Sequence, residues 1–217
     1  QEGLDHVSFV ETGTPHVTKD TKNNPLDICC DKIHIVFDDF DQTDPLQPYK
    51  RYKTTYYARP TDDGTDAQGA SINPRYAIYK SKISWSQPRA SETGSWPATG
   101  EWIGQQQGCQ ECYHEQLIRD YVEDIEFIAL DRNGKRLLPL PDPTTVAGRN
   151  NLYKIRSVDI KLSFRSEKDF FRLETRDGQP RKVLGFSRTK EDYNDRYLRD
   201  SVVVTVYTRN IVDEGLF

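Results

Sequence analysis

The segment IRSVDIKLSF, residues Ile155–Phe164, decides the fold class of this chain. Its apolar side chains at Val158, Ile160 and Leu162 recur at every second position, which is the period of a β-strand. A second apolar run, SVVVTVYTRNI at Ser201–Ile211, lies near the C-terminus and is rich in β-branched residues. Because its apolar residues are continuous, this run predicts a strand that is buried on both faces.

Further strand-like segments lie toward the N-terminus, separated by long polar loops. An Asn-Gly turn at Asn133-Gly134 closes the strand that precedes it. The segment Glu115–Val122 fits a helical turn. Residues Gln1–Val10 fit the last turns of a helix, which Gly13 and Pro15 would end. The other expected strands are Ile33–Phe37, Tyr52–Ala58, Arg75–Trp85, Ile125–Leu130, Phe170–Leu173 and Asp200–Thr208.

The pattern predicts one β-rich domain behind an N-terminal helix, which is an α+β arrangement. Residues 1–24 are expected to be the remnant of that helix and a linker, and residues 25–217 a single globular domain. The sequence contains no Met, so we expect that Gln1 is not the natural translation start and that a targeting segment precedes it.

The charge balance and the hydropathy argue against nucleic acid as a partner and against a membrane-spanning helix within these residues. The net charge is −4, with 30 basic and 34 acidic residues, so the chain lacks the basic excess of a nucleic-acid binder. No run of residues approaches the roughly 20 apolar positions that a spanning helix needs.

The sequence contains no recognisable catalytic motif. Its four His residues are scattered without metalloprotease spacing. Neither a nucleophile elbow nor a phosphate-binding loop occurs. We therefore expect the protein not to be an enzyme.

The four cysteines form two pairs, Cys29-Cys30 and Cys109-x-x-Cys112, and an even number suits disulfides in an oxidising compartment. Because a bond between adjacent cysteines needs a strained ring, we expect bridges that join the first pair to the second. One such bridge closes a loop of about 80 residues and contributes roughly 4 kcal/mol in the chain-entropy model. A zinc site of four thiolates and free thiols remain as alternatives, although adjacent cysteines lack the spacer of a zinc motif.

An acidic loop, TDDGTDAQG, is the better of two candidate calcium sites, because Ca²⁺ takes 6–8 oxygen ligands. It places Asp62, Asp63 and Asp66 around Gly64, and Gly64 and Gly69 permit a tight turn. The loop does not match the EF-hand pattern. We expect no cofactor, with calcium as one interpretation of this loop and an acidic turn in water as the other.

The three tryptophans, Trp85, Trp96 and Trp102, lie within or beside the polar loop of residues 85–108. Clustered Trp side chains often bind sugars or partner proteins. The alternative is that these rings fold back and cover the edge of the sheet.

Three segments in the last part of the chain occur in a characteristic order. They are YVEDIEFIALDRNGKRLLPL, LYKIRSVDIKLSF and RYLRDSVVVTVYTRNI. The positions that carry the pattern are Val122, Ile125, Phe127, Asp131, Gly134, Ile155, Arg156, Val158, Ile160, Leu162, Val204, Val206, Tyr207, Arg209 and Asn210. This order resembles the C-terminal half of the PilW/PulJ class of minor pilins and pseudopilins. The resemblance covers about Lys32 to Ile211 and is strongest after Val122.

The resemblance implies a pilin-like fold, in which a long N-terminal helix packs on one or two mostly antiparallel sheets with long loops. The last strand would enter the sheet that contacts this helix. The chain departs from the class in two ways, because residues 1–217 contain neither the prepilin leader nor the hydrophobic helix, and because the two cysteine pairs are not typical.

The implied function is a non-catalytic subunit that initiates or caps a type IV pilus or a type II secretion pseudopilus at its tip. Its partners would be other minor pilins or pseudopilins. The missing helix would anchor it in the inner membrane, facing the bacterial periplasm or the cell surface. The alternative is a secreted β-rich ligand-binding or adhesin domain that uses the Trp-rich loop of residues 85–108.

Overall fold

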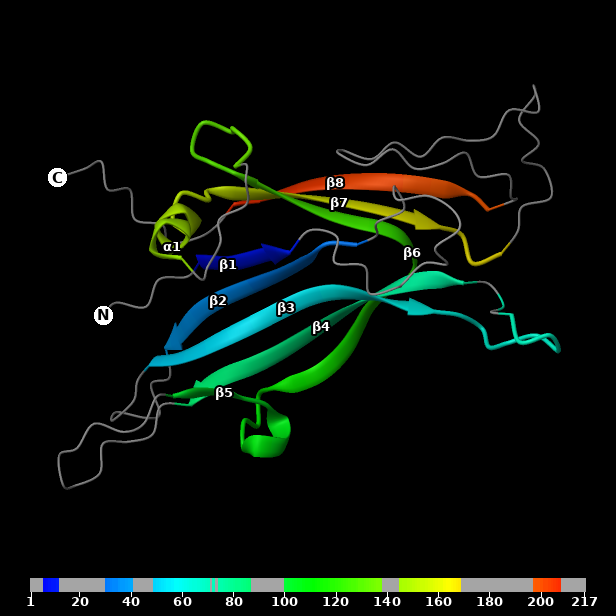
Figure 1. Cartoon of the computed structure of the whole chain (residues 1–217), viewed down its shortest axis with the longest axis horizontal. Helices are drawn as coiled ribbons and strands as arrows, with labels where there is room; N and C mark the ends of the chain where they lie inside the picture. The colour runs from blue at the N-terminus through cyan, green and yellow to red at the C-terminus, as the bar shows by residue number, and fades with distance from the viewer. Residues whose placement is uncertain are drawn as a thin grey trace.

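The chain forms one antiparallel β-sheet in a computed structural model (Figure 1). The structure describes residues 6–11, 30–40, 49–70, 72, 74–86, 100–137, 145–168 and 197–207. These residues contain one short α-helix and one 3-10 turn, so the expected β-rich fold is confirmed. The strands are β1 (His6–Glu11), β2 (Lys32–Phe40), β3 (Tyr49–Thr61), β4 (Arg75–Ser86), β5 (Glu101–Ile103), β6 (Tyr113–Leu130), β7 (Ser157–Arg165) and β8 (Arg199–Tyr207). The helices are η1 (Gln105–Gln107) and α1 (Val146–Leu152).

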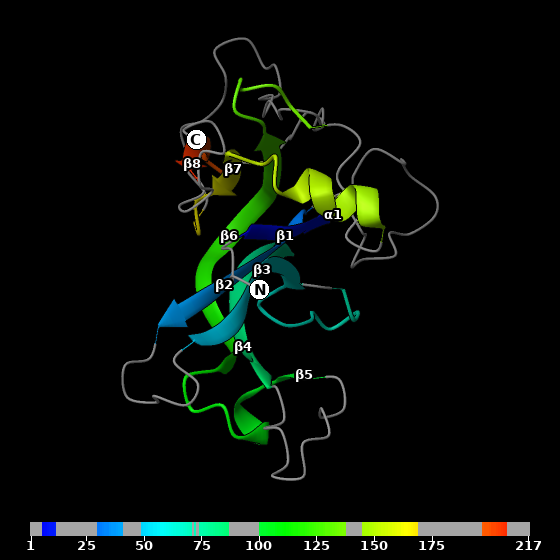
Figure 2. The same ribbon diagram turned by 90° about the vertical axis from the view of Figure 1, so that its left-hand side faces the viewer.

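Strand β6 belongs to both halves of the sheet because it is long and bent. Its residues up to Val122 pair with β4, and its residues from Val122 onward pair with β7. At the bend Tyr121 has a φ of 59°, which is rare for a bulky residue. The sheet order is β1-β2-β3-β4-β6-β7-β8, with β5 beside β4. Figure 2 shows β6, in green, running from β4 to β7.

The apolar core lies between the two halves that β6 connects. Ile33 of β2 and Phe127 of β6 belong to one buried cluster, in which Val122 has no exposed surface. Backbone hydrogen bonding also joins the halves, because Asp31 N donates to the Ile125 carbonyl oxygen at 2.9 Å. Asp31 Oδ2 in turn accepts from Phe127 N at 2.9 Å. The other buried members of the cluster are Cys30, Ala58, Ile78, Ile125, Ala129, Leu152, Ile155 and Val158.

Arg75 holds the bend of β6 in place. Its Nε and Nη2 atoms donate to the two oxygens of Asp120 at 2.8 and 3.0 Å, and its Nη1 lies 2.6 Å from Asp63 Oδ1. The guanidinium also lies 4.4 Å from the centroid of the Tyr121 ring. The hydrogen bonds from Arg75 hold the pKa of the Asp120 carboxyl below its usual range. One buried cation therefore links the loop that contains Asp63 to the bend.

The expectation of helix near the N-terminus is wrong for residues 6–11, which form β1 and pair antiparallel with β2. The expected helical turn at Glu115–Val122 is also wrong, because these residues lie within β6 and pair with β4. In both places an open strand edge is available for pairing, and such pairing overrides a weak local preference. Residues 1–5 and 12–29 lie outside the described part of the chain.

The other strand predictions that fall on described residues are confirmed, as is the Asn-Gly turn after β6. Gly134 has a φ of 72°, and its N–H donates to the Asp131 carbonyl oxygen at 3.0 Å. Phe170–Leu173, Arg209 and Asn210 lie outside the described residues. Among those described, no helix has both the length and the apolar character to cross a membrane.

Candidate interaction surface

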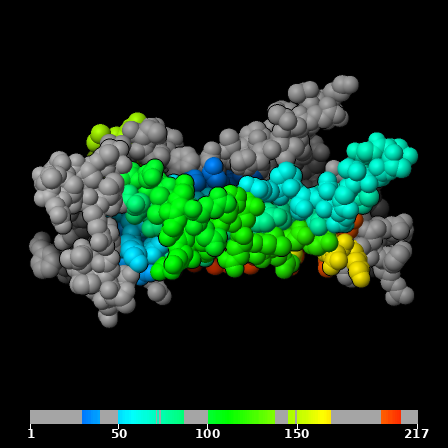
Figure 3. Space-filling view, turned by 90° about the horizontal axis from the view of Figure 1, so that it is seen from below, coloured from blue at the N-terminus to red at the C-terminus, as the bar shows by residue number. Residues whose placement is uncertain are grey.

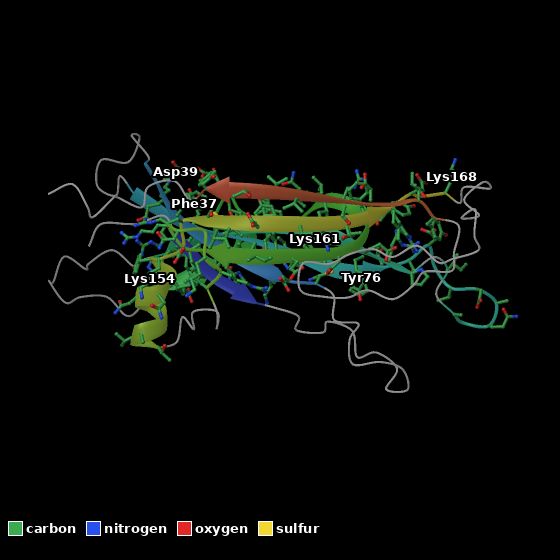
Figure 4. The ribbon with its side chains drawn as sticks, turned by 90° about the horizontal axis from the view of Figure 1, so that it is seen from above. Phe37, Asp39, Tyr76, Lys154, Lys161 and Lys168 are labelled. Carbon is green, nitrogen blue, oxygen red and sulfur yellow. A yellow bond between two sulfur atoms is a disulfide. The ribbon has the colours of Figure 1, made fainter. Side chains whose placement is uncertain are left out.

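β8 is the last strand in the sheet order, and its residues from Asp200 to Tyr207 are exposed. It pairs with β7 along its whole length without a register shift. No strand in the described part of the chain pairs with its other edge. Figure 4 shows β8 along the outer side of β7, and Figure 3 shows its atoms, in orange, at the margin of the lower face. The expectation of a strand buried on both faces is therefore wrong.

Apolar side chains lie on both faces of β8, because successive residues of a strand point to opposite sides. Val203 is 51% exposed and Val204 is 49% exposed, and they lie on opposite faces. Contiguous exposed apolar surface of this kind marks interaction sites on soluble proteins. The exposed apolar residues of the strand are Val202, Val203, Val204, Val206 and Tyr207.

Polar contacts attach β8 firmly to its neighbours. Arg199 Nη2 lies 3.2 Å from Glu123 Oε1, and both side chains are largely buried. Farther along the strand, Thr205 Oγ1 donates to Asp159 Oδ1 at 2.6 Å. The strand is therefore already fixed in the conformation that an incoming strand would need, which lowers the entropic cost of binding.

β6 and β7, the two strands next to β8 in the sheet, carry buried charged residues that face each other. Glu126 and Lys161 lie directly opposite one another in the register of the two strands, and their exposed fractions are 2% and 5%. Figure 4 marks Lys161 on β7. A one-residue slip of β7 would separate two buried opposite charges, which is costly. The pair therefore fixes the register of the strand to which β8 is joined.

The expected bridges between the two cysteine pairs are wrong, because Cys109 and Cys112 are bonded to each other with their Cα atoms 5.3 Å apart. The C-x-x-C spacing brings these two Cα atoms within ordinary disulfide range once the chain turns after η1. Neither thiol is left free or able to bind zinc. Cys30 is also disulfide-bonded, and Cys29 lies outside the described residues.

The Cys109–Cys112 bond packs on a buried aromatic ring. Tyr52 is 2% exposed and lies in one cluster with both cysteines. Its hydroxyl donates to Glu111 Oε2 at 2.6 Å, and Lys82 Nζ lies 3.9 Å from its ring centroid. The disulfide therefore holds Glu111, the residue before Cys112, over the β3–β4 sheet.

The acidic loop does not bring its carboxylates together. Asp62 Oδ1 accepts from Gly64 N at 3.0 Å, and Asp66 Oδ1 accepts from the backbone at 2.8 and 2.9 Å. Asp63 turns instead to Arg75. In the part of the chain that the structure describes, no three His, Cys, Asp or Glu residues are grouped to hold a metal ion.

Two of the three tryptophans meet across β4 and β5. Trp85 and Trp102 pair in register, with ring centroids 5.2 Å apart in an edge-to-face arrangement. Lys53 Nζ lies 4.6 Å from the Trp102 centroid, and burial lowers the pKa of Lys53. Trp96 lies outside the described residues. The half-buried pair lies on one face of the β4–β5 ladder.

An open groove of about 590 Å³ lies on the same face of β3 and β4 as this pair. Its Arg59 has an acidic neighbour, because Arg59 Nη1 lies 2.6 Å from Glu115 Oε1. Tyr57 also donates to Glu115, and burial together with this hydrogen bond raises the pKa of Tyr57 to about 12. Glu115 therefore engages both Arg59 and Tyr57 at the lining of the groove.

Comparison with known proteins identifies no relative of this chain. No family model matches, and neither the curated proteins nor the solved structures contain a match.

Among the described features, the exposed edge of β8 is the strongest candidate for a functional surface. Sequence reasoning placed the strand correctly but assigned it to the interior, because a continuous Val run is typical of buried strands. Its position as the last expected strand of the chain could have indicated an exposed edge, since the last strand of an antiparallel sheet often forms an edge. Thr205 also interrupts the apolar run with a polar residue.

Proposed function

We propose that this chain is a non-catalytic subunit of a protein filament. It acts as a minor pilin or pseudopilin that initiates or caps a type IV pilus or a type II secretion pseudopilus at its tip. The observation that carries the proposal is the apolar, exposed edge strand β8. Soluble monomers usually protect such edges, whereas a subunit that joins its neighbours needs one.

Strand addition explains how this edge would work. An incoming strand gains main-chain hydrogen bonds along β8, and its side chains pack beside exposed Val residues on both faces. The sheet then continues from one subunit into the next. This mode of contact needs no catalytic group and no cofactor.

The sequence resemblance supports the choice of filament. Part of its pattern falls on three neighbouring strands, with Val122, Ile125 and Phe127 in β6, Val158, Ile160 and Leu162 in β7, and Val204, Val206 and Tyr207 in β8. Asp131 and Gly134 lie in the turn after β6, and Ile155 and Arg156 precede β7. The proposal gives the chain sister pilins or pseudopilins as partners. It places the protein in the bacterial periplasm or at the cell surface, with an N-terminal helix as its anchor in the inner membrane.

The test is recovery of the protein in filaments sheared from the cells that produce it. We expect the wild-type protein in the filament fraction, in small amount relative to the major subunit. Val204→Lys should lower that recovery, because it places a charge on the β8 edge. The matched control is Leu117→Lys on β6, which is similarly exposed at 55% and lies away from β8. A protein found only as a free chain in the culture fluid would contradict the proposal.

One observation favours a second function, a secreted ligand-binding or adhesin domain. The Trp85–Trp102 pair lies on the same face of the sheet as the 590 Å³ groove. A sugar that stacks on these rings would change their fluorescence. A saturable change on titration with oligosaccharides, together with absence from filaments, would favour this function over the first.

A further inference from the structure

We infer that the strand which pairs with β8 is the β8 strand of a second copy of this chain, arranged antiparallel about a two-fold axis at Val203. The inference rests on the proposed assembly role of β8 and assigns this edge to a second copy of the same chain, so that sister subunits would contact the resulting dimer through its other surfaces. The resulting dimer has one continuous sheet that runs through both copies.

The sequence of β8 is complementary to itself in this arrangement. When the core faces of the two copies lie on the same side, paired residues must both have even numbers or both odd numbers. Among such registers, the one centred on Val203 pairs all nine residues of Arg199–Tyr207. Val202 then lies opposite Val204, and Ser201 lies opposite Thr205. At these central positions apolar residues meet apolar residues, and hydroxyl groups meet hydroxyl groups.

The charges of β8 do not oppose this pairing. Arg199 lies opposite Tyr207, and Asp200 lies opposite Val206, so no two like charges face one another. Arg199 is already engaged by Glu123, and Asp200 Oδ1 accepts from Ser201 N at 2.7 Å. Like charges directly opposite each other are the usual device that prevents two identical edges from pairing.

The other described edges of the sheet carry features that hinder pairing, and β8 does not. The β1–β2 ladder has a register shift between Val7 and Phe9, and β5 is only three residues long. The first half of β6, whose edge away from β4 has no partner among the described strands, has several register shifts against β4. The β7–β8 ladder is continuous, and β8 contains neither Pro nor Lys. Bulges, short strands, Pro and Lys are the common protections of an edge strand. The unprotected edge is therefore the one with the self-complementary sequence.

The area that two nine-residue strands bury is smaller than a standard interface, so we expect a weak dimer with a Kd on the order of micromolar. Sedimentation equilibrium of the 217-residue chain, from about 1 to about 200 μM, spans the transition that this affinity predicts. Val203→Lys should raise the Kd at least about tenfold, because two ammonium groups would meet at the two-fold axis. Val203 is half exposed, so the variant keeps its fold.

Val204→Lys, on the opposite face of β8, serves as the second variant and should also weaken the dimer, because it places an ammonium group opposite Val202. Leu117→Lys is the matched control and should leave the Kd unchanged. Far-UV circular dichroism confirms that each variant is folded. A chain that stays monomeric throughout the range, or a dimer that neither β8 variant weakens, would overturn the inference.

Cysteine cross-linking tests the register itself. Val203→Cys places the two new thiols opposite each other on the axis, so mild oxidation should give a covalent dimer. Tyr207→Cys is the control, because it lies on the same face but its two copies are about 27 Å apart in this register. Equal cross-linking of both variants, or none of Val203→Cys, would contradict the two-fold pairing.

The two experiments separate the two ideas. A monomer that is nevertheless recovered in filaments overturns the β8 dimer and leaves the filament subunit standing. A β8 dimer that is absent from filaments overturns the filament proposal alone.

Discussion

Arg75 and Arg51 make the same two-pronged contact with a carboxylate at different depths. Arg75 Nε and Nη2 lie 2.8 and 3.0 Å from the oxygens of Asp120, and Arg51 Nε and Nη2 lie 2.7 and 2.9 Å from those of Asp38. The exposed fraction of the side chain is 8% for Arg75 and 42% for Arg51. The carboxylates differ in the opposite sense, since Asp120 is 30% exposed and Asp38 12%. Water reaches the Arg51 guanidinium far more than that of Arg75, so the depth of the cation decides what each pair contributes.

Arg75→Lys is therefore expected to lower the free energy of unfolding by about 2 kcal/mol at pH 7, because an ammonium cannot keep both contacts with Asp120. Arg51→Lys is the matched control and should cost less than about 1 kcal/mol. Urea unfolding followed by Trp fluorescence measures both.

The stabilisation by Asp120, whose pKa is lowered, is present above its unfolded pKa and is lost as the pH falls through its folded pKa. The cost of Arg75→Lys should shrink over that acidic range, and equal costs for the two variants would contradict the argument.

A strand could be predicted from sequence where its own residues alternate between apolar and polar. It could not be predicted where pairing with a neighbouring strand determines the conformation. Ile33–Phe37 and Val158–Phe164 alternate, and they form β2 and β7. Residues 115–122 lack a clear pattern, and they become strand only because β4 offers its edge. The exposure of a strand depends even less on its own sequence, since a run of Val residues has the same composition in the middle of a sheet and at its edge. Predicting whether β8 is buried or exposed therefore required knowledge of the strand order in the sheet.

The candidate sites follow the same distinction. The sequence marked Trp85 and Trp102 as neighbours of one loop, and the β4–β5 register brings their rings together. It marked Asp62, Asp63 and Asp66 as a cluster, but each carboxylate is used by its own turn or by Arg75. Spacing therefore revealed which residue types were available. It did not reveal which atoms they contact.

The Cys109–Cys112 bond has a smaller expected effect on stability than the bridges that the sequence suggested. Its cysteines are separated by three positions, so it closes a very short loop. The double variant Cys109→Ser, Cys112→Ser should lower the free energy of unfolding by about 2 kcal/mol in the chain-entropy model, against roughly 4 for an 80-residue loop. Urea unfolding measures the difference. A non-reducing peptide map should place both cysteines in one fragment, and a fragment that joins either to Cys29 or Cys30 would contradict this pairing.

At the scale of the whole molecule, the bend in β6 makes one unit of two half-sheets. The β2–β4 half and the β6–β8 half contribute Ile33 and Phe127 to the same buried cluster, and Asp31 connects them through the backbone. Leu152 of α1 and Ile155 after it complete the same cluster, so both halves and the helix share one core. Loss of packing in one half should therefore be felt in the other, as in a cooperative single domain.

Phe127→Ala tests this coupling. The side chain is 4% exposed in the shared core, so its loss should cost about 3–5 kcal/mol. Hydrogen exchange followed by mass spectrometry should show reduced protection in β3 and β4 as well as in β7 and β8, and by the same free energy. Leu117→Ala, on the same strand but 55% exposed, is the control and should change protection by less than about 0.5 kcal/mol. If protection falls in β6–β8 while β3 and β4 keep theirs, the two halves unfold separately, and the bend joins two independent units rather than one.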